Sequence, residues 1–171
     1  MFIDKIVKKT VVGRKGLALS FAHLEPEKCL DDISLYGLEN EALKTALKKP
    51  FIVTTALPIS VEFEGKKYEF TIPAGYTWNG ANVPAFAWAI IGQRTDPRFK
   101  LASCVHDYMC EHHEVIGDNR YLSTLIFETL CEYFGRFNDV KRWAMFHSVD
   151  NFQKVFGKDL RGRKWGQLCS I

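Results

Sequence analysis

The character of the chain changes between its first and second halves, and this change constrains the fold more than any other feature. Residues 51–72 are rich in β-branched and aromatic side chains, and apolar residues alternate with polar ones toward the end of this segment. From Pro84 onward, apolar residues recur at helical spacing between glycine and proline breaks. A period of two indicates strands with one buried face, and a period near 3.6 indicates helices. We therefore predict an α+β fold, in which a small antiparallel sheet from the N-terminal half packs on a helical C-terminal half.

The alternating segment predicts a β-hairpin. Its strands are Ile59–Phe63 and Lys67–Ile72, and the Glu-Gly dipeptide between them forms the turn. The first twenty residues are expected to add one or two strands, interrupted at two glycines.

Helices are predicted on both sides of this hairpin. Residues 39–49 form a short helix, because acidic residues open the segment, lysines close it and Pro50 follows. About four helices make up the C-terminal half, each bounded by a capping residue, a proline or a glycine. They are expected over residues 83–92, 97–113, 118–135 and 138–157.

Composition and charge narrow the class of protein. The 171 residues suit one domain, and 47% hydrophobic with 25% charged residues is ordinary for a globular chain. A net charge of +3 is too mild to suggest nucleic acid as a partner. No apolar run approaches the roughly 18 residues that cross a bilayer, so we expect no membrane contact. The N-terminus lacks a signal-peptide pattern and the five cysteines include no CxxC pair, which favours a reduced, cytoplasmic chain.

The last helix and the tail suggest a partner protein. The helix carries one apolar stripe, and Trp143 and His147 lie on its opposite side. A helix of this kind is buried on both faces, or one face meets a partner. Residues 158–171 form a basic tail outside a single domain of residues 1–157, and this tail is either solvated or docked on a partner. Its expected contact residues are Arg161, Arg163, Lys164 and Trp165.

A histidine occupies the centre of the apolar stripe predicted for helix 97–113. His106 lies on this stripe, Asp107 lies at its edge and Glu111 points elsewhere. A buried histidine needs partners for its ring nitrogens, and burial lowers its pKa, which leaves a neutral base or metal ligand. His106 and Asp107 are therefore the candidate catalytic residues and the candidate ligands of a divalent metal. The alternative is a core histidine held by hydrogen bonds for structural reasons.

A row of metal-binding residues on the same helix does not make a zinc site by itself. His106, Cys110 and His113 share one line, but its two ends lie about 10 Å apart on an α-helix. Zinc bonds are only about 2.0–2.3 Å long. A pair from this row could contribute to a site only if another segment supplied the remaining ligands.

A loop rich in glycine, asparagine and aromatic residues follows the hairpin, with the sequence YTWNGANVP over residues 76–84. Its glycines allow positive φ, and its asparagines tolerate left-handed geometry and can bond their own backbone. Held against His106, this loop would form a buried polar network that fixes strand to helix. The members expected from the loop are Tyr76, Trp78, Asn79 and Asn82.

Three motifs in order give the chain a resemblance to a known family. They read IPAGYTWNGANVPAFAW, ASCVHDYM and NRYLSTLIF. Their order and spacing resemble domain-of-unknown-function family 1353, found mainly in bacteriophages, prophages and bacteria. The resemblance covers roughly residues 50–157, and His106 and Asp107 match the His-Asp of the family. Arg120 and Thr124 fall in the third motif, which adds them to the expected polar network.

The chain departs from the family pattern at three polar positions. The acid of the family's loop falls on Asn79, its serine falls on Asn82, and the acid of the third motif falls on Thr124. If the acids and histidine of the family form a divalent-metal site, this chain keeps one carboxylate of three. An amide brings no charge to a metal and cannot act as a general base. Any hydrolytic version of the site is therefore expected to be weakened or lost here.

Taken with the resemblance, these observations imply a bacteriophage or prophage protein that acts by protein–protein contact. We expect a virion component, such as part of a tail or baseplate, or an accessory protein, with the His-Asp and asparagine network serving a structural role. Such a protein is made in the host cytoplasm and could end in the virion. An inhibitor of a host enzyme is not distinguished from this by the sequence.

A metal-dependent hydrolase of cell wall or phosphoester substrates is the alternative from a different class, and it leaves open whether the chain is an enzyme. His106 would then be a ligand or base, and Asp107 a ligand or the residue that orients the imidazole. Asn79 and Asn82 would hold the substrate or a metal-bound water. A divalent metal is the cofactor that this alternative implies.

Overall fold

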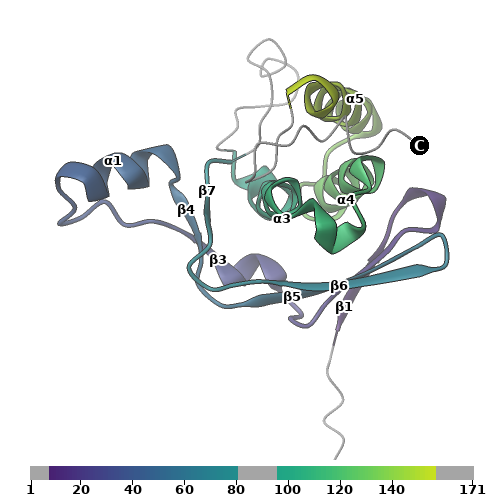
Figure 1. Ribbon diagram of the computed structural model, residues 1–171, viewed down its shortest axis with the longest axis horizontal. Helices are drawn as coiled ribbons and strands as arrows, with labels where there is room; N and C mark the ends of the chain where they lie inside the picture. The colour runs from purple at the N-terminus through teal and green to yellow at the C-terminus, as the bar shows by residue number, and fades with distance from the viewer. Residues whose placement is uncertain (1–7, 81–95, 157–171) are drawn as a thin grey trace, which may run out of the picture.

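Two antiparallel sheets and a layer of helices make up the computed structural model, which describes residues 8–80 and 96–156 (Figure 1). The larger sheet has the strand order β1-β2-β5-β6 and the smaller sheet the order β3-β4-β7. The strands are β1 Lys9–Val12, β2 Ala18–Phe21, β3 Leu30–Asp32, β4 Phe51–Val53, β5 Leu57–Phe63, β6 Lys66–Ile72 and β7 Thr77–Trp78. The predicted α+β class is confirmed, and the N-terminal residues supply two strands of the larger sheet.

The β5–β6 hairpin follows the sequence pattern. Glu64 and Gly65 both have positive φ, at 50° and 74°, which suits a two-residue turn between twisted strands. Val61 pairs with Tyr68 across the ladder. Along β5 the apolar residues are buried, whereas Glu62 is exposed. The hairpin prediction is therefore confirmed, with each strand slightly longer than expected.

Helices cover one face of the larger sheet, while the short helix α1 lies to one side (Figure 1). Their ranges are α1 Asn40–Lys48, α3 Lys100–Glu111, α4 Arg120–Tyr133 and α5 Asp139–Phe156. Asn119 caps α4 by accepting from the backbone N–H of Leu122 at 2.9 Å, and Asn138 caps α5 in the same way. The helix expected over residues 83–92 lies outside the described residues. Within those residues, no helix is long and apolar enough to span a bilayer.

The helix predicted over residues 97–113 differs from the expectation at both ends. Its first turn, Pro97–Phe99, is a 3-10 helix capped by Asp96, and the α-helix ends at Glu111. His113 lies in a separate 3-10 turn, His113–Ile116, which closes at Gly117 in the left-handed conformation. The buried His113 ring places Nδ1 2.5 Å from Oδ1 of Asp118, and this pair fixes the turn. The predicted line of three ligands is therefore wrong, because the helix ends before His113.

The core lies between the inner face of the larger sheet and the helices α3 and α4. Leu19 and Phe21 of β2 and Val61 of β5 are fully buried there. Every residue of α4 from Leu122 to Cys131 is also buried. Because α3 is buried from Leu101 to Asp107, it is surrounded by protein on more sides than a single apolar stripe indicates.

A close approach at Gly13 joins the turn between β1 and β2 to α4. A Cβ at this position would lie 2.1 Å from Oγ1 of Thr129, and that hydroxyl donates to the carbonyl of Leu125. We expect Gly13→Ala to lower the free energy of unfolding by about 1–3 kcal/mol, because the threonine has to move. Urea denaturation measures this loss. Thr129→Ala removes the obstructing atoms, so the double variant should lose less than the sum of the single variants. Strictly additive losses would contradict this account.

Candidate functional site

The loop after the hairpin is anchored to α3 by a buried tryptophan. The indole of Trp78 in β7 is 1% exposed, and its Nε1 donates to Oγ of Ser103 in α3 at 3.0 Å. Its ring also packs against Phe51 of β4, with ring centroids 5.4 Å apart. A buried indole N–H requires an acceptor, and Ser103 provides one from the first turn of α3. Ser103 was not among the residues predicted from the sequence, because one serine in a buried helix gives no signal of its partner.

Asn79 connects the same loop to the His-Asp pair. With its amide nitrogen turned toward α3, Asn79 donates to Oδ2 of Asp107 at 3.2 Å and to the carbonyl of Gly80 at 3.3 Å. Asp107 is 7% exposed, so this amide gives a buried carboxylate one of the donors that it needs. The structure thus brings Asn79 and Asp107 together, although they are far apart in the sequence.

The imidazole of His106 is enclosed by other side chains. The residue is 5% exposed, and its ring packs against that of Phe127 with centroids 5.2 Å apart. Oδ1 of Asp107 lies 3.9 Å from Nδ1, which is too long for a direct hydrogen bond. The sulfur of Cys110 lies 3.7 Å from one ring nitrogen and 3.8 Å from the other. The thiol of Cys110 therefore lies beside both ring nitrogens.

The pKa of His106 differs from the sequence expectation. Burial lowers it, as expected, but the Cys110 sulfur and the Asp107 carboxylate beside the ring together outweigh burial and raise the pKa. The expectation of a lowered pKa is therefore wrong, because it considered burial without these neighbours. For Asp107, burial is the larger effect and raises its pKa against the opposing influence of His106.

Glu111 belongs to the site, although the sequence analysis placed it elsewhere. It lies one turn after Asp107 on α3, and burial raises its pKa, with a further contribution from the Asp107 carboxylate. The hydroxyl of Tyr76 is buried between these groups. Burial first, then Glu111 and Asp107, raise the pKa of that tyrosine. Within the described residues this hydroxyl makes no hydrogen bond of normal geometry. The i, i+4 spacing from Asp107 was the signal that could have identified Glu111.

The third motif links α4 to α5. The guanidinium of Arg120, largely buried at the start of α4, donates to the carboxylate of Asp150 and to its carbonyl oxygen at 3.2 Å. The buried hydroxyl of Thr124 donates to the carbonyl of Arg120 at 3.3 Å. Arg120 therefore joins α4 to α5, whereas the bond from Thr124 stays within α4. Asp150 was missed from the sequence, where it reads as one polar residue in an apolar helix.

An exposed stripe on α5 contains the predicted contact residues Trp143 and His147. We call Val140, Trp143 and His147 the α5 ledge. Val140 is 72% exposed and Trp143 is 65% exposed, and the Trp143 and His147 rings lie 4.6 Å apart. A groove of about 780 Å³ runs beside the ledge, between the β1–β2 turn and the helices α4 and α5. Salt bridges from Arg14 to Glu128 and from Arg142 to Glu132 neutralise charges along this groove.

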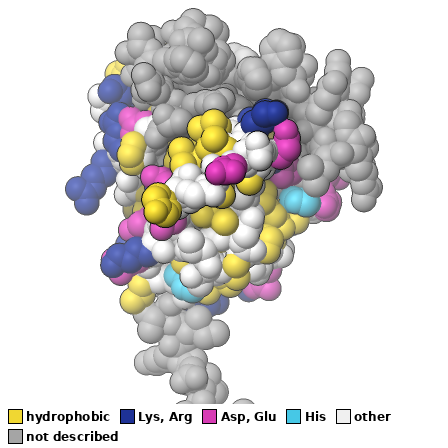
Figure 2. Space-filling model, turned by 90° about the vertical axis from the view of Figure 1, so that its left-hand side faces the viewer, with side chains coloured by type: hydrophobic (Ala, Val, Ile, Leu, Met, Phe, Trp, Pro, Cys, Tyr) yellow, Lys and Arg dark blue, Asp and Glu magenta, His cyan; other side chains and the backbone are white. Residues whose placement is uncertain are grey.

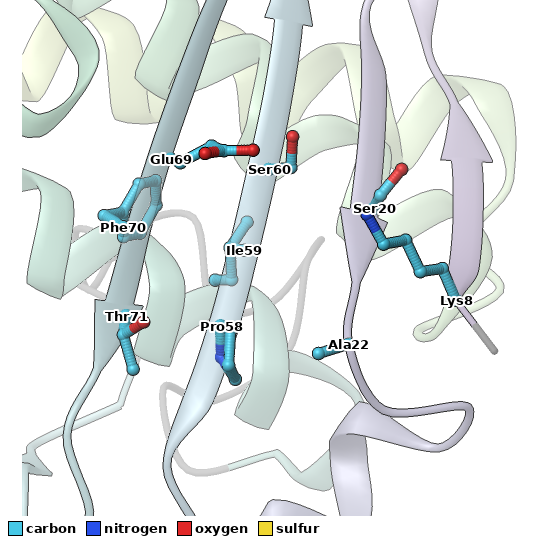
Figure 3. Close-up of a pocket in the computed structure, with 9 residues that line it drawn as sticks. All are labelled: Lys8, Ser20, Ala22, Pro58, Ile59, Ser60, Glu69, Phe70 and Thr71. Carbon is cyan, nitrogen blue, oxygen red and sulfur yellow. The ribbon is translucent and has the colours of Figure 1, made fainter. Parts of the chain in front are cut away.

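A second hollow, of about 440 Å³, lies on the face of the larger sheet opposite the helices (Figure 3). Hydroxyls of Ser20, Ser60 and Thr71 line it, with Lys8 and Glu69 at its sides. Apolar side chains, among them Pro58 and Phe70, also line it, and antiparallel sheets commonly leave one face to water. We therefore assign no chemistry to this hollow.

The remaining predicted site residues cannot be placed. Asn82, Arg161, Arg163, Lys164 and Trp165 lie outside the described residues. Over residues 8–80 and 96–151, no group of three or more histidine, cysteine or acidic side chains is arranged to hold a metal ion. The metal-binding role of His106 and Asp107 stays a prediction.

The polar residues that meet around α3 come from one continuous stretch of sequence, and that stretch matches a family model. The model is described as "Protein of unknown function (DUF1353)" and matches residues 55–149. The chain belongs to this family. The DUF1353 match includes the hairpin, the Asn79 loop, the His106-Asp107 pair and Arg120, and it ends within α5. It confirms the resemblance, with bounds narrower than residues 50–157. No curated protein and no solved structure matches the chain.

The raised pKa of Glu111 predicts how stability changes with pH. Its pKa in the folded protein is above the ordinary value of 4.5, so the charged form is less favourable in the folded than in the unfolded state. Glu111 therefore contributes stability below pH 4.5 that is lost as pH rises through its folded pKa. We expect Glu111→Gln to stabilise the protein at neutral pH and to change little in acid, as measured by urea denaturation. Glu114→Gln is the control, because the Glu114 side chain is 61% exposed. A loss of stability at neutral pH in Glu111→Gln would contradict the assignment.

Proposed function

We propose that this DUF1353 protein acts by protein–protein contact in a bacteriophage or prophage, as a virion component such as part of a tail or baseplate, or as an accessory protein. The His106, Asp107 and Asn79 network serves its fold. The phage setting rests on the occurrence of the family, and the mode of action rests on the two features argued below.

The first supporting feature is the packing of the network. His106 is enclosed by Phe127 and Cys110, and the Asp107 carboxylate accepts from Asn79. These contacts join the loop to α3, and Trp78 with Ser103 continues the junction. A general base must reach the proton that it removes, and an imidazole that is only 5% exposed is poorly placed for that task. A structural role accounts for these contacts without a substrate.

The α5 ledge is the observation that carries the proposal. Tryptophan is among the residue types most enriched at the energetic centres of interfaces, and a surface tryptophan that is 65% exposed leaves a large apolar area in water. Two ion pairs, Arg14–Glu128 and Arg142–Glu132, line the adjacent groove, so a partner can cover these four charges without leaving them unpaired. A partner that covers the ledge would remove this apolar area from water, which favours association.

Replacement of the ledge tryptophan tests the proposal. We expect Trp143→Ala to leave stability within about 0.5 kcal/mol of wild type, because the side chain is exposed. Its incorporation into phage particles, measured by quantitative mass spectrometry of purified particles, should fall strongly, since such residues often contribute 2 kcal/mol or more to binding. Tyr36→Ala is the matched control, because Tyr36 is a 96% exposed aromatic residue in the loop before α1. Figure 2 views the side of the molecule that carries α1, where apolar and charged side chains are interspersed. Equal incorporation of Trp143→Ala and wild type would contradict the role of the ledge. Absence of the wild type from purified particles would contradict the proposal that the protein is a virion component.

A metal-dependent hydrolase is the second candidate, and the acidic pair on α3 favours it. Asp107 and Glu111 lie one turn apart, both with raised pKa values caused first by burial. Carboxyl groups of this kind can act as general acids near neutral pH. His106 and Asp107 would hold the divalent metal, which would activate a water for attack on a cell-wall or phosphoester bond.

Removal of the imidazole separates the two candidates. If the network is structural, His106→Ala should lower the free energy of unfolding by on the order of 2–4 kcal/mol, because it leaves a cavity and a buried carboxylate with fewer partners. Metal analysis of the purified wild type should then find no stoichiometric ion. His147→Ala, which removes an exposed imidazole, should leave stability unchanged. A bound metal that is present in wild type and lost in the more conservative His106→Gln variant would instead support the hydrolase.

A further inference from the structure

The dipeptide Asn79-Gly80 combines an asparagine with the residue that least hinders attack on its side chain. It is the only Asn-Gly pair among the 171 residues. The backbone nitrogen that follows an asparagine can attack the side-chain amide carbon, and a following side chain slows this reaction by crowding the nucleophile. Glycine has no Cβ, so Asn79 lacks that protection.

The side chain of Asn79 lies close to the backbone of Gly80. Its amide nitrogen is 3.3 Å from the carbonyl oxygen of Gly80. Gly80 has φ of 91°, a conformation that residues with a Cβ rarely adopt. Asn79 is half-buried rather than sealed, which leaves water access to the side chain.

We propose that Asn79 is a site of spontaneous covalent modification by deamidation. The nitrogen of Gly80 loses its proton and bonds to Cγ of Asn79, and the bond from Cγ to the amide nitrogen breaks. That nitrogen takes up the proton and leaves as ammonia, which gives a five-membered cyclic imide. Water then opens the imide at either carbonyl, to give an aspartyl or an isoaspartyl residue. The reaction needs only water and is independent of the proposed function.

The product of deamidation changes the contact between Asn79 and Asp107. The amide that now donates to Oδ2 of Asp107 at 3.2 Å is replaced by a carboxyl group. Two carboxylates at this separation cannot both be charged without a large cost. The isoaspartyl product also lengthens the backbone beside Trp78. Deamidation is therefore expected to loosen the junction between the loop and α3.

Peptide mapping of aged protein tests the proposal. The full-length protein is incubated folded at neutral pH and digested with trypsin, which releases residues 68–94 as one peptide containing both Asn79 and Asn82. Fragment spectra should show the mass gain of an amide-to-acid conversion at Asn79 that grows with time, while Asn82 persists. Asn82 is the internal control, because the β-branched Val83 follows it.

Two variants separate the chemistry from its consequence. Asn79→Gln keeps an amide but lengthens the side chain, so it should show no conversion over the same period. Asn79→Asp represents one product, and its urea midpoint should fall below that of fresh wild type, as should that of the aged wild type. No conversion at Asn79 in the folded protein, under conditions in which the urea-unfolded chain converts, would overturn the proposal. Conversion at Asn82 as fast as at Asn79 would overturn it too.

Discussion

The hydrogen bond from the indole of Trp78 to Ser103 is the contact on which the site depends. It fixes the end of β7 to the first turn of α3, at 3.0 Å and out of contact with water. Because the next residue along the chain is Asn79, the same anchor delivers an amide to the Asp107 carboxylate. An indole N–H left without an acceptor in this position would cost about 1–3 kcal/mol. The position of Asn79 is therefore set by a neighbour whose own contribution is purely structural.

The two acidic side chains of this site have raised pKa values. Asp107 and Glu111 are carboxyl groups on one side of α3, and burial makes the charged form of each less favourable. His106, Lys49 and the Asn79 amide offset part of this cost. Such a cluster is compatible with catalysis and with a purely structural junction, since both require buried polar groups. The enclosure of His106 by Phe127 and Cys110 favours the structural junction.

The protein separates this internal junction from the exposed α5 ledge. The α5 ledge lies beyond α4, and α4 is joined to α5 by the Arg120–Asp150 pair. Both of these residues are largely buried, so that the ion pair holds the helix at a defined position rather than adding a surface charge. Trp143 and His147 are thereby presented on a helix that is fixed by its opposite side, where Met145 and Val149 are buried. Fixed positioning of this kind lowers the entropy cost of binding a partner.

The sequence by itself determined the fold class, the hairpin and the helix starts, because alternation, helical spacing and capping residues act over short distances. It also placed His106 in the core and put Trp143 with His147 opposite the apolar stripe of α5, but it left open whether that side is buried or meets a partner. It did not determine that α3 stops at Glu111, because the helical spacing continues to His113, whereas the structure forms a separate 3-10 turn there that the His113–Asp118 pair holds. Nor did it identify Ser103, Glu111 or Asp150, whose partners lie on other elements. The pKa of His106 rises instead of falling because Cys110 and Asp107, four and one residues along the same helix, together outweigh burial, and the sequence pattern does not weigh these neighbours against burial.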